Sequence, residues 1–317
     1  MDPAKYGIST IPLNHEPYGP IKPEVLKGAN KDKVAVVTGA ARGIGRAISE
    51  NLANSGANLA IIDLLAEPLQ ETKAICEKYG VKVKTYPCDV TDVPRVRAVL
   101  DEIVKDFGPI ECVSMLPALL NNAGVSPGKP QWMESFEDFW KTIEINFKSH
   151  MLTIWAVLPS MRERKSGVII NIASRAATVD FPFAIGYNSS KCADTRAIST
   201  LQEELDLDNL DIQTYALHPG GVYTAMAAKE VRPEMVEKYP QLTSHGTDFR
   251  SLFKDPPELC GATCAYLATG KAKELRGMYI DCRQDIQRLQ AAGREKLQQD
   301  GLYTLTMKFL EGYNNEP

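Results

Sequence analysis

The chain has 317 residues and a formal net charge of −4, from 36 basic and 40 acidic side chains. Apolar residues make up 44 % of the sequence and charged residues 24 %, which is typical of a soluble globular protein and excludes disorder over most of the chain. Nucleic-acid binding relies on clustered Lys and Arg, and no such stripe is present, so nucleic acid is not expected as a partner. No 18 apolar residues run together, so no contact with a membrane through a spanning segment is expected.

The seven cysteines are scattered and form no CxxC pair. The nearest two, Cys260 and Cys264, lie one helical turn apart without His or further Cys at zinc spacing, so no metal site is predicted. We expect all seven to be buried or partly buried thiols of a reducing compartment. The first residues lack the apolar run of a signal peptide. Together these observations predict a cytoplasmic protein.

Residues 1–32 are rich in Pro, Gly and Lys without periodicity, which predicts an extended arm on the surface. From Lys33 onward, short apolar runs alternate with longer helical patterns. The run VAVVT at 34–38 is typical of a strand buried on both faces, and the helical pattern that follows it ends at Gly56. The same alternation predicts strands at 57–63, 81–87, 118–121, 167–173, 211–217 and 277–282, and helices at 66–79, 92–107, 134–161 and 186–207.

Strands that alternate with helices of this length form right-handed βαβ units. We therefore predict an α/β fold with a single Rossmann-like, doubly wound parallel sheet of about seven strands over residues 33–283. Ligands of such sheets bind at the carboxyl ends of the strands.

Three segments depart from the alternation. Residues 109–117 are expected to form a loop or bulge, because Pro117 cannot donate a hydrogen bond inside a sheet. Residues 225–255 combine helix formers, charges and prolines and predict a lid over the substrate site. Residues 284–317 predict a C-terminal extension, helical over 284–312, that packs on the body or on a neighbouring subunit.

The segment TGAARGIG at 38–45 lies directly between the first strand and the first helix. Glycines permit a tight turn and a close approach to phosphate, and the helix N-terminus offers free N–H groups. The turn therefore predicts a dinucleotide pyrophosphate site. A Walker motif needs Lys and then Ser or Thr after the last Gly, whereas Arg46-Ala47 follow here, which disfavours a nucleotide triphosphatase. The candidates in this turn are Gly39, Arg42, Gly43, Ile44 and Gly45.

Asp63 ends the second predicted strand, 18 residues after Gly45. An acidic residue there accepts hydrogen bonds from an adenosine ribose diol and repels a 2′-phosphate. No Lys or Arg follows until Lys73, so we expect NAD(H) as the preferred cofactor. Arg42 is able to hold a 2′-phosphate, so NADP(H) stays open. The structural alternative for Asp63 is an N-cap of the next helix.

Tyr187 and Lys191 are separated by four residues on a predicted helix, which places them on one helical face. Ser174 lies 13 residues before Tyr187, just after the strand at 167–173. A YxxxK pair alone is common by chance. A strand, a Ser and this helix in order, downstream of a dinucleotide turn, predict one catalytic site.

These motifs resemble the short-chain dehydrogenase/reductase family, in its TGxxxGxG and YxxxK subgroup, over residues 33–283. The motifs that carry the resemblance, in family order, are TGAARGIG (38–45), CDV (88–90), NNAG (121–124), Ser174 with YNSSK (187–191), and HPGGVYT (218–224). The tail beyond residue 283 is similar to that of extended fungal members. By position, the resemblance implies further cofactor contacts at Asp89, Val90, Asn122, Ala123, Gly124, Tyr187, Lys191, Pro219, Gly220, Val222 and Thr224.

The resemblance also implies a catalytic tetrad of Asn146, Ser174, Tyr187 and Lys191. Tyr187 exchanges a proton with the substrate oxygen, and the ammonium of Lys191 lowers the pKa of that phenol. Ser174 binds the substrate oxygen, Lys191 binds the nicotinamide ribose, and Asn146 holds a water. The expected reaction interconverts a secondary alcohol and a ketone, with hydride transfer by the cofactor.

Several of these residues have structural alternatives. Asn146 is able to cap or kink a helix, Ser174 to form a turn, Thr224 to cap a helix, and Asp89 to stabilise a turn. His218 is interpreted as a structural or pocket-lining residue.

Two functional alternatives remain at this point: a cofactor-binding regulatory or assembly protein without turnover, and a biosynthetic enzyme that couples redox to isomerisation. The family resemblance also implies a homodimer or homotetramer. The sequence does not identify the substrate or the direction of the reaction.

Overall fold

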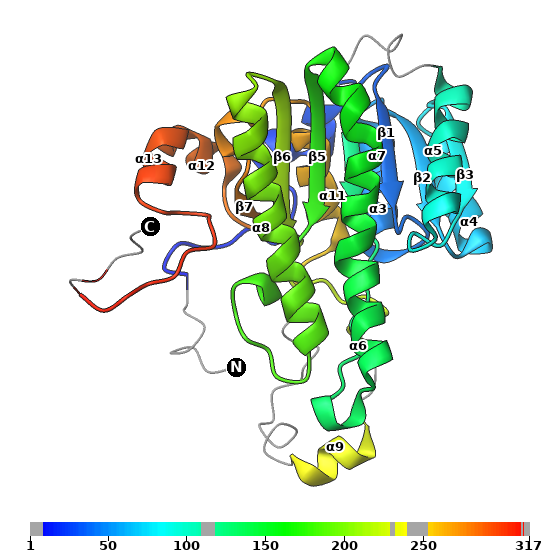
Figure 1. The fold of residues 1–317 in the computed structure, drawn as a ribbon. Helices are drawn as coiled ribbons and strands as arrows, with labels where there is room; N and C mark the ends of the chain where they lie inside the picture. Colours follow the sequence, from blue (N-terminus) through cyan, green and yellow to red (C-terminus); the bar gives the residue numbers. More distant parts are fainter. Residues whose placement is uncertain (1–8, 109–117, 229–231, 240–252, 312, 314–317) are drawn as a thin grey trace.

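The computed structural model describes residues 9–108, 118–228, 232–239, 253–311 and 313. Its centre is one seven-stranded sheet, in which every neighbouring pair of strands is parallel (Figure 1). The strand order is β3-β2-β1-β4-β5-β6-β7. The strands are β1 (Val34–Thr38), β2 (Asn58–Asp63), β3 (Val83–Pro87), β4 (Ala118–Asn121), β5 (Ser166–Ile172), β6 (Asp211–His218) and β7 (Tyr279–Asp281).

The predicted Rossmann-like fold is confirmed. The chain leaves β1 towards β2 on one side, and β4 returns to pair with β1 on the other, with Val37 opposite both Ile61 and Leu120. The strand order therefore reverses between β1 and β4. Crevices at the carboxyl ends of such reversal points bind ligands in open α/β sheets.

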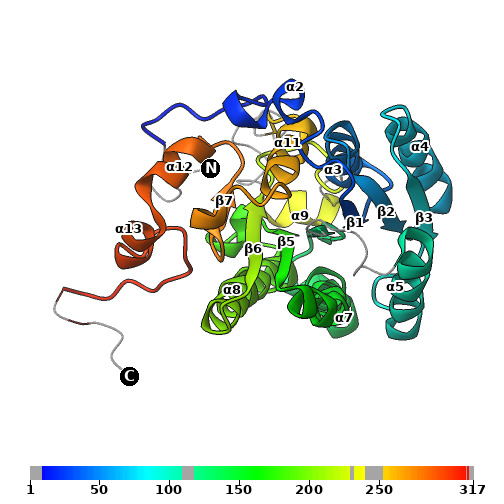
Figure 2. The ribbon, with the colours of Figure 1, turned by 90° about the horizontal axis from the view of Figure 1, so that it is seen from above.

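Helices cover both faces of the sheet (Figure 2). One face carries α3 (Gly43–Asn54), α4 (Ala66–Glu77) and α11 (Pro257–Leu267), and the other carries α5 (Val93–Phe107), α7 (Ser149–Arg164) and α8 (Ile185–Leu207). Each face has its own apolar core, because successive side chains of a strand point to opposite sides. Helix α11 was not predicted from the sequence.

The predicted helix at 134–161 is interrupted in the structure. It consists of α6 (Phe136–Ile143), a π-helical segment η3 (Glu144–Lys148) and α7, which continues to Arg164. A π segment inserts an extra residue into a helical turn and often marks a functional position. It contains Asn146.

The prediction of an extended surface arm is wrong for residues 18–32. This stretch forms η1 (Gly19–Ile21) and α2 (Pro23–Leu26), and Ile21 is fully buried in the core on the α3 and α11 face. Asn30 is also fully buried and donates a hydrogen bond of 2.8 Å to the Ala265 carbonyl of α11. The stretch therefore belongs to the body of the protein.

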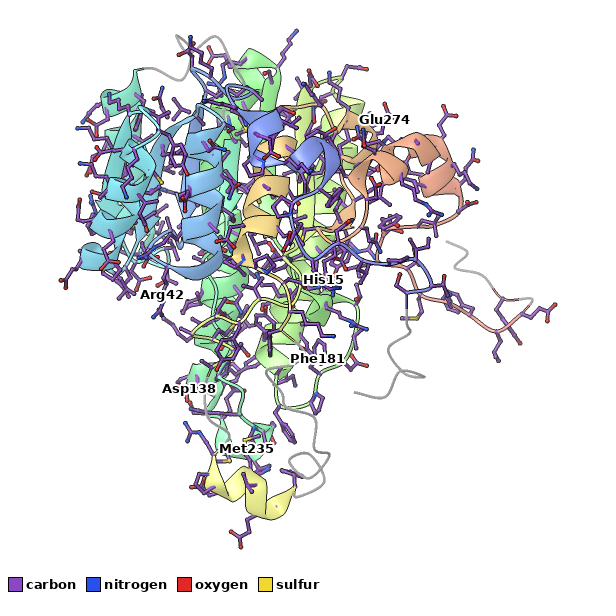
Figure 3. All side chains as sticks on the ribbon, turned by 180° about the vertical axis from the view of Figure 1, so that it is seen from behind. His15, Arg42, Asp138, Phe181, Met235 and Glu274 are labelled. Atoms are coloured by element: carbon purple, nitrogen blue, oxygen red, sulfur yellow. The ribbon has the colours of Figure 1, made fainter. Side chains whose placement is uncertain are left out.

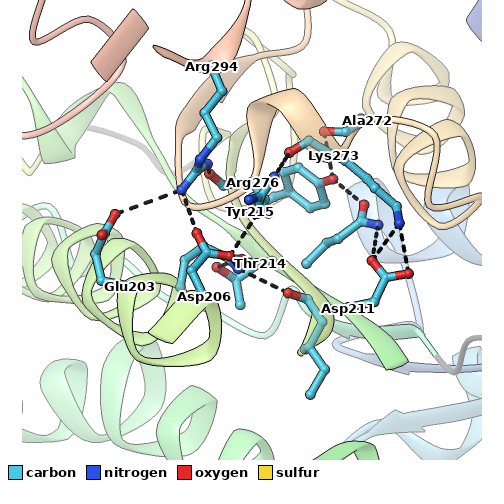
Figure 4. Close-up of polar contacts among 12 residues, drawn as sticks. Glu203, Asp206, Asp211, Thr214, Tyr215, Ala272, Lys273, Arg276 and Arg294 are labelled. Carbon is cyan, nitrogen blue, oxygen red and sulfur yellow. Dashed lines mark hydrogen bonds and ion pairs between the residues drawn. The ribbon is translucent and has the colours of Figure 1, made fainter. Parts of the chain in front are cut away.

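The C-terminal extension is helical only in part. It forms α12 (Ile286–Ala292) and α13 (Arg294–Gln299), so the predicted helix is wrong beyond Gln299. The chain then returns to the sheet, where the Tyr303 carbonyl accepts from Tyr279 N–H at 2.9 Å, and beyond Leu305 it extends away from the body (Figures 1 and 2). Asp206 of α8 anchors it: the Arg294 and Arg276 guanidinium groups both donate to this carboxylate at 2.8 Å (Figure 4).

The carboxyl edge of the sheet carries a projection made by α6 and α9 (Pro233–Lys238) (Figure 1). The Trp132 indole N–H, in η2 (Gln131–Met133), donates to the Tyr239 hydroxyl at 3.1 Å and ties the two parts together. Much of the predicted lid at 225–255, and all of 109–117, lie outside the described residues.

Two further predictions concern single properties of the chain. None of the helices described is long and apolar enough to cross a membrane. The prediction that all cysteines are at least partly buried is wrong for Cys192, which is exposed, whereas Cys112 lies outside the described residues.

Candidate active site

The glycine turn is closed so tightly that side chains are excluded from it. Gly39 has a φ of +67°, and a Cβ there would lie 2.8 Å from the Ala123 backbone. A Cβ on Gly45 would lie 1.9 Å from the Gly39 carbonyl oxygen. The Asn122 amide donates to that same oxygen at 2.9 Å. The turn after β1 therefore packs directly on the segment after β4.

The N-terminus of α3 is the feature of this turn that is predicted to bind phosphate. Its N-cap, Arg42, is exposed and gives the helix no side-chain capping hydrogen bond. The first N–H groups of a helix carry partial positive charge and are free to bind an anion. A Cβ on exposed Gly43 would touch only the Thr224 side chain, at 3.6 Å, and Ile44 is half-buried. The turn thus fits a pyrophosphate.

Asp63 lies at the end of β2 beside the turn. Its carboxylate accepts one hydrogen bond from Ala41 N–H and one from Leu65 N–H, both at 2.9 Å. The predicted interaction with a ribose diol would use the remaining acceptor capacity of the two oxygens. Asp63 thus also fixes the conformation of the turn.

Asp89 and Val90 follow β3 at the same edge of the sheet, and both are half-buried. The Asp89 carboxylate accepts from the hydroxyl and from the backbone N–H of Thr91. These two hydrogen bonds lower the pKa of Asp89. The turn-stabilising alternative for Asp89 is therefore present in the structure.

The segment after β6 is held by a buried aspartate that the sequence analysis missed. Asp255 accepts from Gly221 N–H at 2.5 Å and returns a backbone hydrogen bond to the Gly221 carbonyl at 3.0 Å. His15 of the N-terminal region contacts the other carboxylate oxygen, Nδ1 to Oδ1, at 2.5 Å (labelled in Figure 3). Pro219 and Val222 are buried in this segment, and Gly220 packs against Asp255. No sequence motif marks Asp255, since its partners are distant in the chain.

Asn146 holds the segment after Gly124 in place. The Asn146 Oδ1 accepts from Val125 N–H at 2.7 Å, while its Nδ2 donates to the Val125 carbonyl at 2.8 Å and to the Ser190 hydroxyl at 3.1 Å. The residue is fully buried. Asn146 lies in the π segment, so it also has a structural role in this helix.

Ser174 and Tyr187 meet beyond the end of β5. The Ser174 hydroxyl caps η4 (Arg175–Ala177) by accepting from Ala176 N–H, and it lies near enough to the Tyr187 phenol to lower its pKa. Burial raises the pKa of Tyr187, and the hydrogen bond from Ser174 acts in the opposite direction. The phenol therefore keeps its proton in the protein alone.

Lys191 is buried one turn after Tyr187 on α8. Its ammonium donates to the Ile172 carbonyl at 2.6 Å, and a Cβ on Gly124 would lie 4.0 Å from it. Burial lowers the pKa of Lys191, and the nearby Asp194 carboxylate raises it. Burial is the larger effect on Tyr187, so the acidification of this phenol by the Lys191 ammonium stays a prediction.

The predicted site residues thus gather along one edge of the sheet, from the end of β3 to the segment after β6. Figure 3 shows Arg42 at this edge, with Asp138 of α6 and Met235 of α9 on the projection beyond it. The sequence profile of the family described as short chain dehydrogenase matches residues 33–235. The chain belongs to the short-chain dehydrogenase family.

Individual relatives agree with this assignment to a family of oxidoreductases. A short chain dehydrogenase of Pseudocercospora fijiensis is 28 % identical and aligns with 97 % of this chain and 99 % of its own. The structure of a short chain dehydrogenase from Mycobacterium paratuberculosis bound to NAD matches with a TM-score of 0.69 and 28 % identity, over 82 % of this chain and 100 % of that one. The structure of a 7α-hydroxysteroid dehydrogenase complexed with NADH and 7-oxo glycochenodeoxycholic acid matches with a TM-score of 0.67 and 26 % identity. This match covers 81 % of this chain and 94 % of that one.

His218 in this dehydrogenase is buried at the end of β6, and its ring stacks on Tyr279. Its Nδ1 has no hydrogen-bond partner among the described residues. Burial lowers the pKa of His218 to about 4. The imidazole is therefore neutral at pH 7, which agrees with a structural residue.

We expect His218 to make the dehydrogenase acid-sensitive. Below pH 6.5 the unfolded chain binds a proton at His218, whereas the folded protein binds this proton only near pH 4. The free energy of unfolding therefore falls as the pH decreases across this interval. The loss amounts to about 3 kcal/mol when the interval has been crossed. Chemical denaturation at several pH values should show this loss in the natural protein and not in His218→Phe. If the free energy of unfolding depended on pH in the same way in both proteins, this role of His218 would be contradicted.

Within the described ranges, no group of three or more His, Cys, Asp or Glu side chains is arranged to hold a metal ion.

Proposed function

We propose that this dehydrogenase interconverts a secondary alcohol and a ketone, with a nicotinamide dinucleotide as the hydride carrier. The observation that carries the proposal is that Ser174, just after β5, lies beside the Tyr187 phenol of α8 at the carboxyl edge of the sheet. Lys191 on the same helix and Asn146 in the π segment both approach Gly124, which lies directly after the segment that packs on the glycine turn. Ser174 and Tyr187 therefore lie beside the proposed dinucleotide site, the cradle between the glycine turn at 38–45 and the segment 122–124.

The residues fit such a cofactor. The helix N-terminus at Gly43 would bind the pyrophosphate, and the segment of Asn122, Ala123 and Gly124 would lie under the adenosine ribose. Thr224 faces Gly43 across the cradle and would contact the same phosphates. The nicotinamide ring supplies the hydride acceptor or donor when bound. Two solved relatives were obtained with NAD and with NADH, which supports a cofactor of this class.

The chain's own residues handle the proton. In ketone reduction, the Tyr187 Oη gives its proton to the substrate oxygen, and Ser174 orients that oxygen by a hydrogen bond. In alcohol oxidation, the phenolate takes the proton back. Because burial raises the pKa of Tyr187 in the protein without ligand, the Lys191 ammonium together with the positive charge of an oxidised nicotinamide would favour the phenolate.

We expect NADH to bind at least about tenfold more tightly than NADPH, because an acidic residue at the end of the second strand, here Asp63, repels a 2′-phosphate. Fluorescence titration with both cofactors measures the ratio of the dissociation constants. Asp63→Asn removes the charge and should narrow this ratio. Tighter binding of NADPH by the natural protein would contradict the assignment of Asp63.

The reaction is tested with the purified chain, NAD or NADP with a panel of secondary alcohols, and the reduced cofactors with the matching ketones. Turnover is followed by nicotinamide absorbance, and products are identified by mass spectrometry. Cofactor binding without turnover on any substrate would favour the regulatory alternative. A product with a rearranged skeleton would favour redox-coupled isomerisation.

A further inference from the structure

A buried histidine lies behind the cofactor cradle, and the proposed reaction leaves it without a function. His150 of α7 is 1 % exposed. Its Nε2 lies 3.0 Å from the Ala123 carbonyl oxygen, and its Nδ1 lies 3.2 Å from Oδ2 of Asp194, a fully buried residue of α8. The imidazole therefore bridges the segment after β4 and the helix that carries Lys191.

The geometry fixes where protons are held. A carbonyl oxygen only accepts hydrogen bonds, so Nε2 of His150 carries a hydrogen and donates it to Ala123. With Nε2 protonated, a bare Nδ1 and an ionised carboxylate are both acceptors and would repel each other. The contact between His150 and Asp194 therefore requires one further proton between Nδ1 and Oδ2.

Asp194 is itself held rigidly. Its Oδ1 accepts from the Asn171 amide of β5 at 2.7 Å, and Asn171 Oδ1 accepts from the Asn121 amide of β4 at 3.0 Å. The Thr153 hydroxyl of α7 is the last member of this hydrogen-bond network and donates to Asn121 Oδ1 at 2.7 Å. Asn171 and Asn121 are fully buried, and Thr153 is 1 % exposed. Fully satisfied networks of this kind define one arrangement of the groups that they join.

Ala123 is the point where this network reaches the cradle. Its backbone would lie 2.8 Å from a Cβ on Gly39, and the adjacent Asn122 donates to the Gly39 carbonyl. We propose that His150 and Asp194 are positioning residues for the cofactor: His150 Nε2–H fixes the Ala123 carbonyl, and Asp194 fixes the imidazole. This inference rests on the proposed function, since it concerns the same dinucleotide site.

Two substitutions of His150 separate its two contacts. The side-chain amide of Gln reaches the position of Nε2, so His150→Gln keeps the donor to Ala123 and loses the contact with Asp194. The shorter amide of Asn reaches the position of Nδ1, so His150→Asn keeps the contact with Asp194 and loses the donor to Ala123. Each variant loses one buried hydrogen bond and is the matched control of the other.

Fluorescence titration with NADH gives the dissociation constant for each folded variant, and thermal unfolding gives its stability. We expect His150→Asn to raise the dissociation constant roughly tenfold, about the loss of one hydrogen bond, and His150→Gln to stay within about threefold of the natural protein. Tyr215→Phe serves as a remote control, because the Tyr215 hydroxyl bonds Ala272 on the far side of β6 (Figure 4). It should lower stability and leave the dissociation constant unchanged.

Asp194 is tested in the same way. Asp194→Asn retains an oxygen for Asn171 and an N–H group for Nδ1 of a neutral imidazole, so it should bind NADH better than Asp194→Leu, which retains neither. If these variants do not fold, NMR of the natural protein serves instead: both ring N–H protons of His150 should exchange slowly with water.

The outcomes are distinguishable. Equal NADH affinity of His150→Asn and His150→Gln, or affinity losses that follow stability in every variant including Tyr215→Phe, would overturn the inference while leaving the proposed function intact. Rapid exchange of both His150 ring protons would also overturn it. A natural protein that binds neither NADH nor NADPH would remove the proposed function itself.

Discussion

Replacing Tyr187 by Phe is expected to reduce kcat by about three orders of magnitude, within the range of general acid–base catalysis. The substitution removes one oxygen and leaves the ring on α8. Without that oxygen, no phenol remains to exchange a proton with the substrate, whereas the Ser174 hydroxyl keeps its hydrogen bond from Ala176 N–H. Initial rates at saturating cofactor and substrate measure the effect.

The stability of Tyr187→Phe separates chemistry from folding. We expect its NADH affinity and melting temperature to stay close to those of the natural protein, since the ring remains in place. Tyr266→Phe is a suitable control, because Tyr266 is buried and its hydroxyl bonds Gln290 at 2.9 Å, on α12. That control should retain full turnover. A Tyr187→Phe variant that keeps natural turnover would exclude Tyr187 as the acid–base residue.

The parts of the fold that were predictable are those specified by short stretches of sequence. The run VAVVT predicted the first strand with the observed bounds, and β4 lies at 118–121 as expected. Short, continuous apolar runs are typical of strands that are buried on both faces. The glycine turn was found for the same reason, since its strand, turn and helix are contiguous.

What the sequence did not predict depends on contacts between distant residues. Ile21 is in the core because α11 lies against η1, and Asn30 bonds a residue 235 positions later. The π segment around Asn146 is not visible in an apolar pattern. His150 and Asp194 are 44 positions apart, and neither belongs to a motif of its own. Their contact exists only once β4, β5, α7 and α8 are assembled.

Gly45→Ala is expected to abolish cofactor binding at accessible concentrations and to destabilise the fold by about 3 kcal/mol. In an ordinary helix interior the same change stabilises by up to about 1 kcal/mol, because Ala has the higher helix propensity. Here the new Cβ would lie 1.9 Å from the Gly39 carbonyl oxygen and 2.5 Å from the Asn122 amide nitrogen. Neither neighbour is a flexible side-chain end free to move away, since the carbonyl is backbone and the amide is bonded to it.

The clash must therefore open the turn, and an opened turn moves Gly39 away from the segment after β4 that forms the other wall of the cradle. NADH titration and chemical denaturation of Gly45→Ala measure the two consequences together. Gly80→Ala is the matched control, because Gly80 has a φ of +76° and no atom within 4 Å of an added Cβ, at a site remote from the cradle. Gly80→Ala should lower the free energy of unfolding by about 1 kcal/mol, through backbone strain, and leave the NADH affinity unchanged. If Gly45→Ala binds NADH as the natural protein does, the cofactor lies elsewhere, and the glycine turn is only a structural connection between β1 and α3.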